Sequence, residues 1–301
     1  MKNNRITLPQ YGFMMFLSLL STLLFIEGEP SMPNLVAVIV PLIINILTVI
    51  LYKGGAGIFI RSVISVYLLV FCLIVGEKFC EFLYKDLGYG PYWALALLTV
   101  FFAYLCSVKG VEALSRASVI ISFFVFTALS AGAALSFFKI EPEFSFSGYS
   151  GFILPFMLLF PSAVYVLLYE NIIPQKKYTL YVLSAILLFV IAFYYFLPDN
   201  KVAVGIFKGA DGLLSAILSV SAVYALSGSA TSILSGYQHK RITFPILFIT
   251  VFGLVTALLY SDNLSHFLRS DAVLISASVS LVLALLCAGV KDLQIMNKNT
   301  K

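Results

Sequence analysis

Three charged side chains, Glu77, Lys78 and Glu81, interrupt an otherwise apolar stretch of the sequence. Ionisable groups are costly inside a membrane helix and usually face protein or water. Glu77 and Glu81 are four residues apart and would share one helix face, and Lys78 is near enough in sequence to compensate one of them. Glu77 would lie roughly 24 Å along the helix from Arg61, near the outer membrane surface. We therefore favour an interfacial cluster of snorkelling groups over a charged binding site.

A second candidate site is the glycine- and proline-punctuated run from Gly151 to Glu170, with Pro155 and Pro161 inside it. A proline removes a backbone donor and clashes with the preceding helical turn. The carbonyls freed near Met157–Phe160 would then be available to a ligand. The competing interpretation is a kinked structural helix, because prolines are frequent in membrane helices.

The residue patterns give little support to sodium binding, metal binding or catalysis. The hydroxyl-rich run from Ser227 to Ser232 suits close helix packing better than sodium binding, since no carboxylate lies near it in sequence. No Cys/His spacing suits a metal, and His239 and His266 fall in separate loops. No nucleophile elbow and no phosphate-binding glycine loop occurs. We expect neither an enzyme nor a cofactor-binding or metal-binding protein.

The elements that would position these residues are transmembrane helices. Of the 301 residues, 61% are hydrophobic and 11% are charged, where a soluble domain carries roughly 25% charged residues. The apolar runs are continuous, so helices rather than barrel strands are expected. About ten spans are predicted: Pro9–Ile26, Leu35–Tyr52, Phe59–Tyr84, Tyr92–Val108, Val111–Phe138, Phe152–Tyr169, Tyr178–Leu197, Gly212–Leu234, Phe244–Tyr260 and Ala272–Val290.

Charge alternation supports this count and orients it. With the N-terminus inside, every inner connection carries at least two basic residues, which is the positive-inside pattern. The inner set comprises Lys2, Arg5, Lys53, Arg61, Lys109, Arg116, Lys176, Lys177, Lys240, Arg241, Lys291, Lys298 and Lys301. Both termini are then cytoplasmic. The net charge of +5 needs no nucleic-acid partner, because topology accounts for it.

Ten helices divide into two sets of five, which is the geometric condition for an inverted repeat. The chain would form a single transmembrane domain over 1–301, with one five-helix repeat in 1–138 and the other in 150–290. The interrupted sixth helix would be the partner of the first. No connection is long enough to form a separate soluble domain.

Two stretches carry a resemblance to a known family. The first runs from Val75 to Phe124 and includes Gly110-Val111-Glu112-Ala113-Leu114-Ser115-Arg116 at the entry to the fifth span; the second runs from Leu158 to Lys177. Their order and spacing resemble the B-subunit (GerAB-type) spore-germination permeases of the amino acid–polyamine–organocation transporter superfamily. The resemblance implies an all-α membrane protein with a LeuT-like 5+5 inverted repeat.

The resemblance also implies a function. It predicts a germinant-receptor permease subunit that binds a small amino-acid-like ligand between helices 1, 3, 6 and 8, beside partner subunits in a bacterial cytoplasmic membrane or spore inner membrane. The residues assigned to that pocket are Ser21, Thr22, Phe160, Pro161, Ser162 and Tyr165. A secondary amino-acid transporter and a non-transporting membrane scaffold remain alternatives.

Overall fold

The computed structural model describes residues 5–25, 32–54, 56–85, 87–137, 151–173, 211–236 and 240–299. Within these ranges the regular elements are helices and one short strand pair. Among the described residues, five helical segments are long and apolar enough to cross a membrane: Ile58–Lys85, Gly110–Ser130, Ile153–Asn171, Ala216–Ser235 and Asp262–Gly289. Several such helices in one chain indicate a multi-pass membrane protein.

The first half of the chain begins with α1 (Leu8–Leu19), whose start is fixed by reciprocal capping between Thr7 and Gln10. At Leu20 the helix tightens into the 3₁₀ helix η1 (Leu20–Phe25), although the run from Phe13 onward contains neither glycine nor proline. The helices that follow are α2 (Met32–Leu51), α3 (Ile58–Lys85), α4 (Tyr92–Val108) and α5 (Gly110–Phe137).

The second half opens with two short helices in line, α6 (Ile153–Leu158) and α7 (Phe160–Leu168), followed by the 3₁₀ turn η2 (Tyr169–Asn171). The remaining helices are α10 (Asp211–Gly236), α11 (Lys240–Tyr260), α12 (Asp262–Leu268) and α13 (Asp271–Asn299). A parallel two-residue strand pair joins β1 (Ile6–Thr7) to β2 (Ile172–Ile173). It ties the start of α1 to the end of η2.

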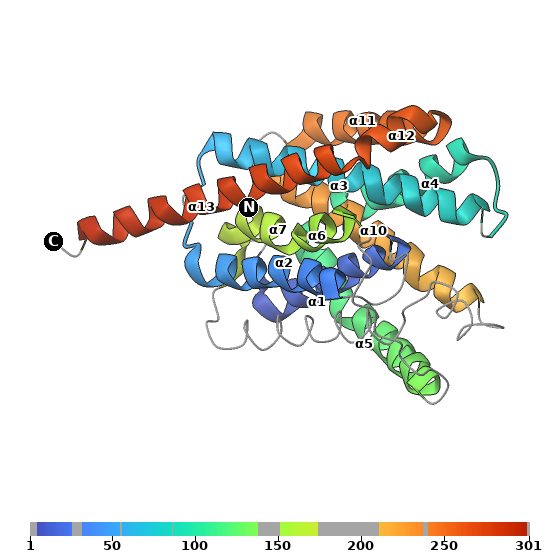
Figure 1. The fold of residues 1–301 in the computed structure, drawn as a ribbon, viewed down its shortest axis with the longest axis horizontal. Helices are drawn as coiled ribbons and strands as arrows, with labels where there is room; N and C mark the ends of the chain where they lie inside the picture. The colour runs from blue at the N-terminus through green and yellow to red at the C-terminus, as the bar shows by residue number, and fades with distance from the viewer. Residues whose placement is uncertain are drawn as a thin grey trace.

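The helices form one bundle in which α10 is the central element, packing against α1, α3 and α4 (Figure 1). Helix α7 packs against α2, α3 and α10, while α6 packs against α2, α13 and η1. The last part of α13 extends beyond the bundle towards the C-terminus (Figure 1). This arrangement brings the first and sixth expected spans together through their common neighbour α10.

The predicted spans agree well with the helices over the described residues. The fourth span, Tyr92–Val108, has the bounds of α4, and the third and fifth differ from α3 and α5 by one residue at each end. The expected seventh span, Tyr178–Leu197, lies outside the described residues, as does the basic pair Lys176 and Lys177. The last span differs most, since the separate helix α12 precedes it and α13 continues to Asn299.

Candidate ligand site at a broken helix

The sixth span is interrupted where the sequence predicted an interruption, between Leu158 and Phe160. Pro161 is in the first turn of α7, where its missing N–H is tolerated. Leu159 joins the two helices and keeps right-handed helical dihedral angles, with φ −78° and ψ −10°. The break is therefore a local loss of backbone hydrogen bonds rather than an unwound segment.

A buried asparagine of α2 bridges this break. The Asn45 side-chain amide donates to the carbonyl of Leu158, at 2.8 Å. Its oxygen accepts the Ser162 backbone N–H at 2.9 Å and also the Ser162 hydroxyl. One neutral side chain thus satisfies a carbonyl of α6 and two donors of α7. Because buried polar groups are costly when unpaired, Asn45 compensates the interruption directly.

Two buried tyrosines complete the contacts to the break. The Tyr11 hydroxyl of α1 donates to the carbonyl of Pro161, and the Tyr67 hydroxyl of α3 donates to the carbonyl of Phe156, both at 2.5 Å. The carbonyls of Phe156, Leu158 and Pro161 therefore already accept hydrogen bonds from α3, α2 and α1. A ligand would have to replace one of these protein donors.

The residues predicted to form one pocket lie on two faces of α7. Phe160 stacks on Phe71 of α3, with ring centroids 4.3 Å apart. Ser162 faces Asn45, and Tyr165 packs edge-on against Tyr11 and Tyr52 at 5.7 and 6.4 Å. Pro161, between these faces, contributes its carbonyl to Tyr11.

The predicted contribution of the first span is buried and internally hydrogen-bonded. Ser21 and Thr22 lie in η1, and their hydroxyls donate to the carbonyls of Ser18 and Leu19, each at 2.6 Å. Nearby, Gly228 of α10 faces both Phe160 and Ser18, and a Cβ added at Gly228 would lie 3.8 Å from each. The junction of α1, α7 and α10 is thus closely packed around one glycine.

The charged cluster of α3 differs from the interfacial group expected from the sequence. Glu77 is only 3% exposed, because α12 covers it. Its Oε1 accepts from the Arg269 guanidinium at 2.8 Å and from the Ser265 hydroxyl. The snorkelling interpretation is therefore wrong for Glu77, whose carboxylate is buried and paired with Arg269 at the end of α12.

Glu81 shares this helix face, as its spacing from Glu77 predicted. Its carboxylate lies 2.5 Å from Lys85, 3.6 Å from Lys78 and 3.9 Å from Arg269. Lys78 thus compensates one glutamate, as expected. The Oε2 atoms of both glutamates are buried and accept no hydrogen bond. The cluster joins α3 to the α12–α13 corner and contains two carboxylate oxygens with unused acceptor capacity.

Asn45, Tyr11, Tyr67 and Arg269 were not singled out from the sequence. Asn45 did give a signal, since it is a lone amide in an apolar helix and such residues usually find a partner inside a bundle. The others gave none, because tyrosines are abundant here and Arg269 lies in the expected connection between the ninth and tenth spans. Over the described residues, no three His, Cys, Asp or Glu side chains lie close enough to hold a metal ion.

The chain was compared with protein-family models, curated proteins and solved structures, and no match was found in any of the three. The interpretation of this site therefore depends on its geometry and on the residue patterns described above.

Proposed function

We propose that the chain is a ten-span permease-type membrane subunit of the spore-germination class, which binds a small amino-acid-like ligand at the break between α6 and α7. The observation that carries this proposal is the buried break itself, contacted by polar side chains of three other helices. Discontinuous helices near mid-membrane are the usual ligand-binding elements of inverted-repeat transporters.

The proposed five-plus-five repeat is supported by the geometry of the first and sixth spans, which the repeat would make equivalent. The first span changes from α to 3₁₀ geometry at Leu20, and the sixth is broken at Leu159. Both changes occur in helices that a repeat would make equivalent, and both helices pack on α10. The positive-inside pattern then orients the bundle with cytoplasmic termini.

The contacts of Asn45 suggest the chemistry of the ligand. Its carboxamide donates to the Leu158 carbonyl and accepts from the Ser162 N–H. An amino-acid-like zwitterion offers the same pair of functions, because its ammonium donates and its carboxylate accepts. We infer that the ligand binds by replacing Asn45, whose side-chain amide takes the positions of the ligand's ammonium and carboxylate.

The apolar part of such a ligand would lie beside Phe160, where Gly228 and Ser18 face it from α10 and α1. This placement gives a sharp test. Gly228→Ala adds one methyl group at ordinary van der Waals distance from Phe160 and Ser18, so folding should be unaffected. The same methyl group removes space from the ligand.

The experiment measures thermal stabilisation of the purified chain in nanodiscs by each of the common amino acids. At least one should raise the melting temperature of the unsubstituted protein. Gly228→Ala should lower the affinity for that amino acid tenfold or more, a loss of about 1.4 kcal/mol in binding free energy. The matched control is Gly253→Ala in α11, where an added Cβ meets nothing within 4 Å. Equal responses of the two variants would exclude this ligand position.

A second candidate function is a non-transporting membrane scaffold that assembles partner subunits. The observation favouring it is that protein side chains already satisfy the carbonyls of the break. Co-purification of partners without stabilisation by any amino acid would select the scaffold. Gradient-dependent uptake into proteoliposomes would instead identify a secondary transporter.

A further inference from the structure

The short helix α12 is held to the bundle by few apolar contacts. Among its seven residues, Ser265 is the buried one, and the side chains of Leu264 and Phe267 are exposed. A segment with little buried apolar surface belongs to the least stable part of a fold, and lids and binding loops are drawn from such segments. The corner between α12 and α13, residues 261–271, is therefore a candidate for local opening.

The contact between this corner and α3 is polar and incomplete. Glu77 accepts from the Arg269 guanidinium at 2.8 Å and from the Ser265 hydroxyl. The Oε2 atoms of Glu77 and Glu81 are buried and accept no hydrogen bond. A buried acceptor without a donor costs stability, and both oxygens would be hydrated if the corner moved away from α3. Opening therefore recovers part of the free energy that is lost with the ion pair.

The same corner is tied to the broken span. The Asp271 carboxylate, at the start of α13, accepts the backbone N–H of Phe152 at 3.3 Å, directly before α6 begins. A Cβ added at Gly151, where φ is +88°, would lie 3.4 Å from the same carboxylate oxygen. Helix α13 also packs against α6. A displacement of the corner would therefore carry the start of α6 with it.

Both ties lie on the same side of the break. Glu77 is about 15 Å along α3 from Tyr67, which contacts the break, at 1.5 Å per residue. Asp271 meets the start of α6, about 10 Å along the helix from Leu159. These ends of α3 and α6 are the ones that the positive-inside pattern orients outwards. The corner thus connects, on the outer side, two helices that meet at the break.

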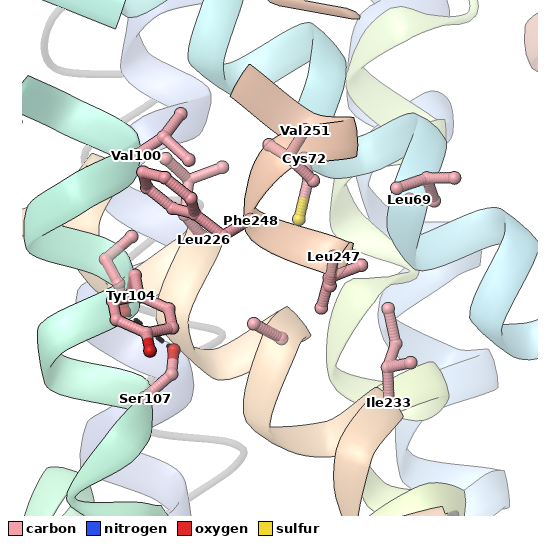
Figure 2. Close-up of a pocket in the computed structure, with 12 residues that line it drawn as sticks. Leu69, Cys72, Val100, Tyr104, Ser107, Leu226, Ile233, Leu247, Phe248 and Val251 are labelled. Carbon is pink, nitrogen blue, oxygen red and sulfur yellow. Dashed lines mark hydrogen bonds between the residues drawn. The ribbon is translucent and has the colours of Figure 1, made fainter. Parts of the chain in front are cut away.

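The opposite side of α3 is too closely packed to move with the corner. A Cβ added at Gly76, next to Glu77, would lie 3.0 Å from Val255 of α11. Further along, α3, α4, α10 and α11 enclose a cavity of about 30 Å³, into which the Cys72 sulfur points (Figure 2). That volume is enough for a water molecule but not for a ligand. Helices α3, α4 and α11 therefore form a fixed wall beside the corner.

We propose that the α12–α13 corner is a lid on the outer side of the break, which opens by moving away from α3 together with the start of α6. The Glu77–Arg269 pair is its latch. Its hinge is Ser261, whose extended backbone (φ −130°, ψ 95°) separates α12 from α11. This inference rests on the proposed function, since it names the route by which an amino acid reaches the break.

The first test is hydrogen–deuterium exchange of the unsubstituted protein and of Glu77→Gln in nanodiscs. The substitution keeps the side-chain shape and replaces a charge-assisted hydrogen bond by a neutral one, roughly half as strong. The amides of Ser265 and Arg269 in α12 and of Phe156 in α6 all hydrogen-bond to carbonyls one turn earlier. We expect each to exchange about fivefold faster in Glu77→Gln, while the amide of Val100 in α4 is unchanged.

The matched control is Glu112→Gln in α5, whose partner Arg116 lies on the same helix, and it should leave all these amides unchanged. In Glu77→Gln, unchanged exchange, faster exchange in α12 but not in α6, or faster exchange in the wall as well would each overturn the lid. A second variant, Ser265→Ala, removes only the hydroxyl contact and keeps the test available if Glu77→Gln does not fold. It should accelerate the same amides by a smaller factor.

The second test measures access to the break. Leu159→Cys places a thiol where α6 and α7 meet, at a position that is 3% exposed. Its reaction with a membrane-impermeant thiosulfonate is compared with that of the protein retaining Leu159, which gives the background from the native cysteines. Adding Glu77→Gln should raise the rate about fivefold, and adding Glu112→Gln should not. Equal rates would overturn the lid. Neither measurement uses an amino acid, so the lid and the ligand site can fail separately.

Discussion

The break between α6 and α7 and the corner between α12 and α13 interrupt two helices of the same bundle, but different chemistry stabilises each. At the break, the neutral side chains of Asn45, Tyr11 and Tyr67 satisfy the freed backbone groups. At the corner, Arg269 pairs with Glu77 of α3, and a buried oxygen of each glutamate there is left without a hydrogen bond. Hydrogen bonds from neutral side chains satisfy the backbone groups of the break, while the corner depends on ion pairs.

The break and the corner should differ in how much stability a side-chain substitution removes. Neutral hydrogen bonds to backbone groups are lost completely when the side chain is removed, and no solvent replaces them in a buried site. The charged corner is partly open, since Arg269 is 27% exposed, so water can screen a lost partner there. We therefore expect the break to be the more sensitive of the two regions.

The largest effect is expected from Asn45→Leu, which keeps the side-chain volume but leaves the Leu158 carbonyl and the Ser162 N–H unpaired. At about 1–3 kcal/mol for each buried unsatisfied group, the stability loss should be about 4 kcal/mol. Thermal unfolding in detergent measures it. The control is Thr48→Val on the same helix, because the Thr48 hydroxyl donates only to Ile44 within α2. Similar losses in both variants would show that Asn45 does not hold the break.

The second effect in size is expected from Arg269→Gln, which leaves the buried Glu77 carboxylate without its cation. Breaking a buried pair costs roughly 3–5 kcal/mol, and the partial exposure of Arg269 reduces this to about 2 kcal/mol. The double variant Glu77→Gln/Arg269→Gln should recover part of the loss. If the double variant is as unstable as the sum of the single ones, the two side chains do not interact.

A smaller loss, about 1 kcal/mol, is expected from Tyr67→Phe, which removes one donor from the Phe156 carbonyl and keeps the ring contact with Phe156. Tyr89→Phe at the surface should be neutral. The same unfolding measurement compares them. A neutral Tyr67→Phe would mean that the Phe156 carbonyl finds another donor.

The smallest effect is expected from Lys85→Ala, which removes an exposed partner of Glu81. Exposed i,i+4 ion pairs contribute roughly 0.3–0.5 kcal/mol, so stability should hardly change, and high salt should erase the difference. A loss of stability larger than that of Tyr67→Phe would show that the charged corner, rather than the break, is more sensitive to substitution.

The sequence predicts the spans well because continuous apolar runs and prolines are local signals. The interruption near Pro161 was predicted for this reason. The partners of the break were not, since the Asn45 contacts join residues 113 and 117 positions away in the chain. Likewise, Glu77 was interpreted as interfacial because no local signal shows that α12 folds over it, bringing Arg269 from 192 positions away. Pairing across a bundle depends on packing, which a single sequence does not record.

The predicted pocket residues show the same limit. The residues were expected to share one pocket, but α7 presents Phe160 to α3 and α10 while Ser162 and Tyr165 face α2 and α1. Helical periodicity separates these faces. Which neighbour covers each face follows only from the assembled bundle.

The most direct test of the account is the ligand affinity of Asn45→Ala, measured in nanodiscs with the amino acid that stabilises the unsubstituted protein most. If Asn45 occupies the positions that the ligand takes, Asn45→Ala leaves the ligand no side chain to displace there, and affinity should rise about tenfold. Gly228→Ala should lower the affinity of the same ligand. An unchanged or weaker affinity in Asn45→Ala, or no amino-acid response in either protein, would contradict the account.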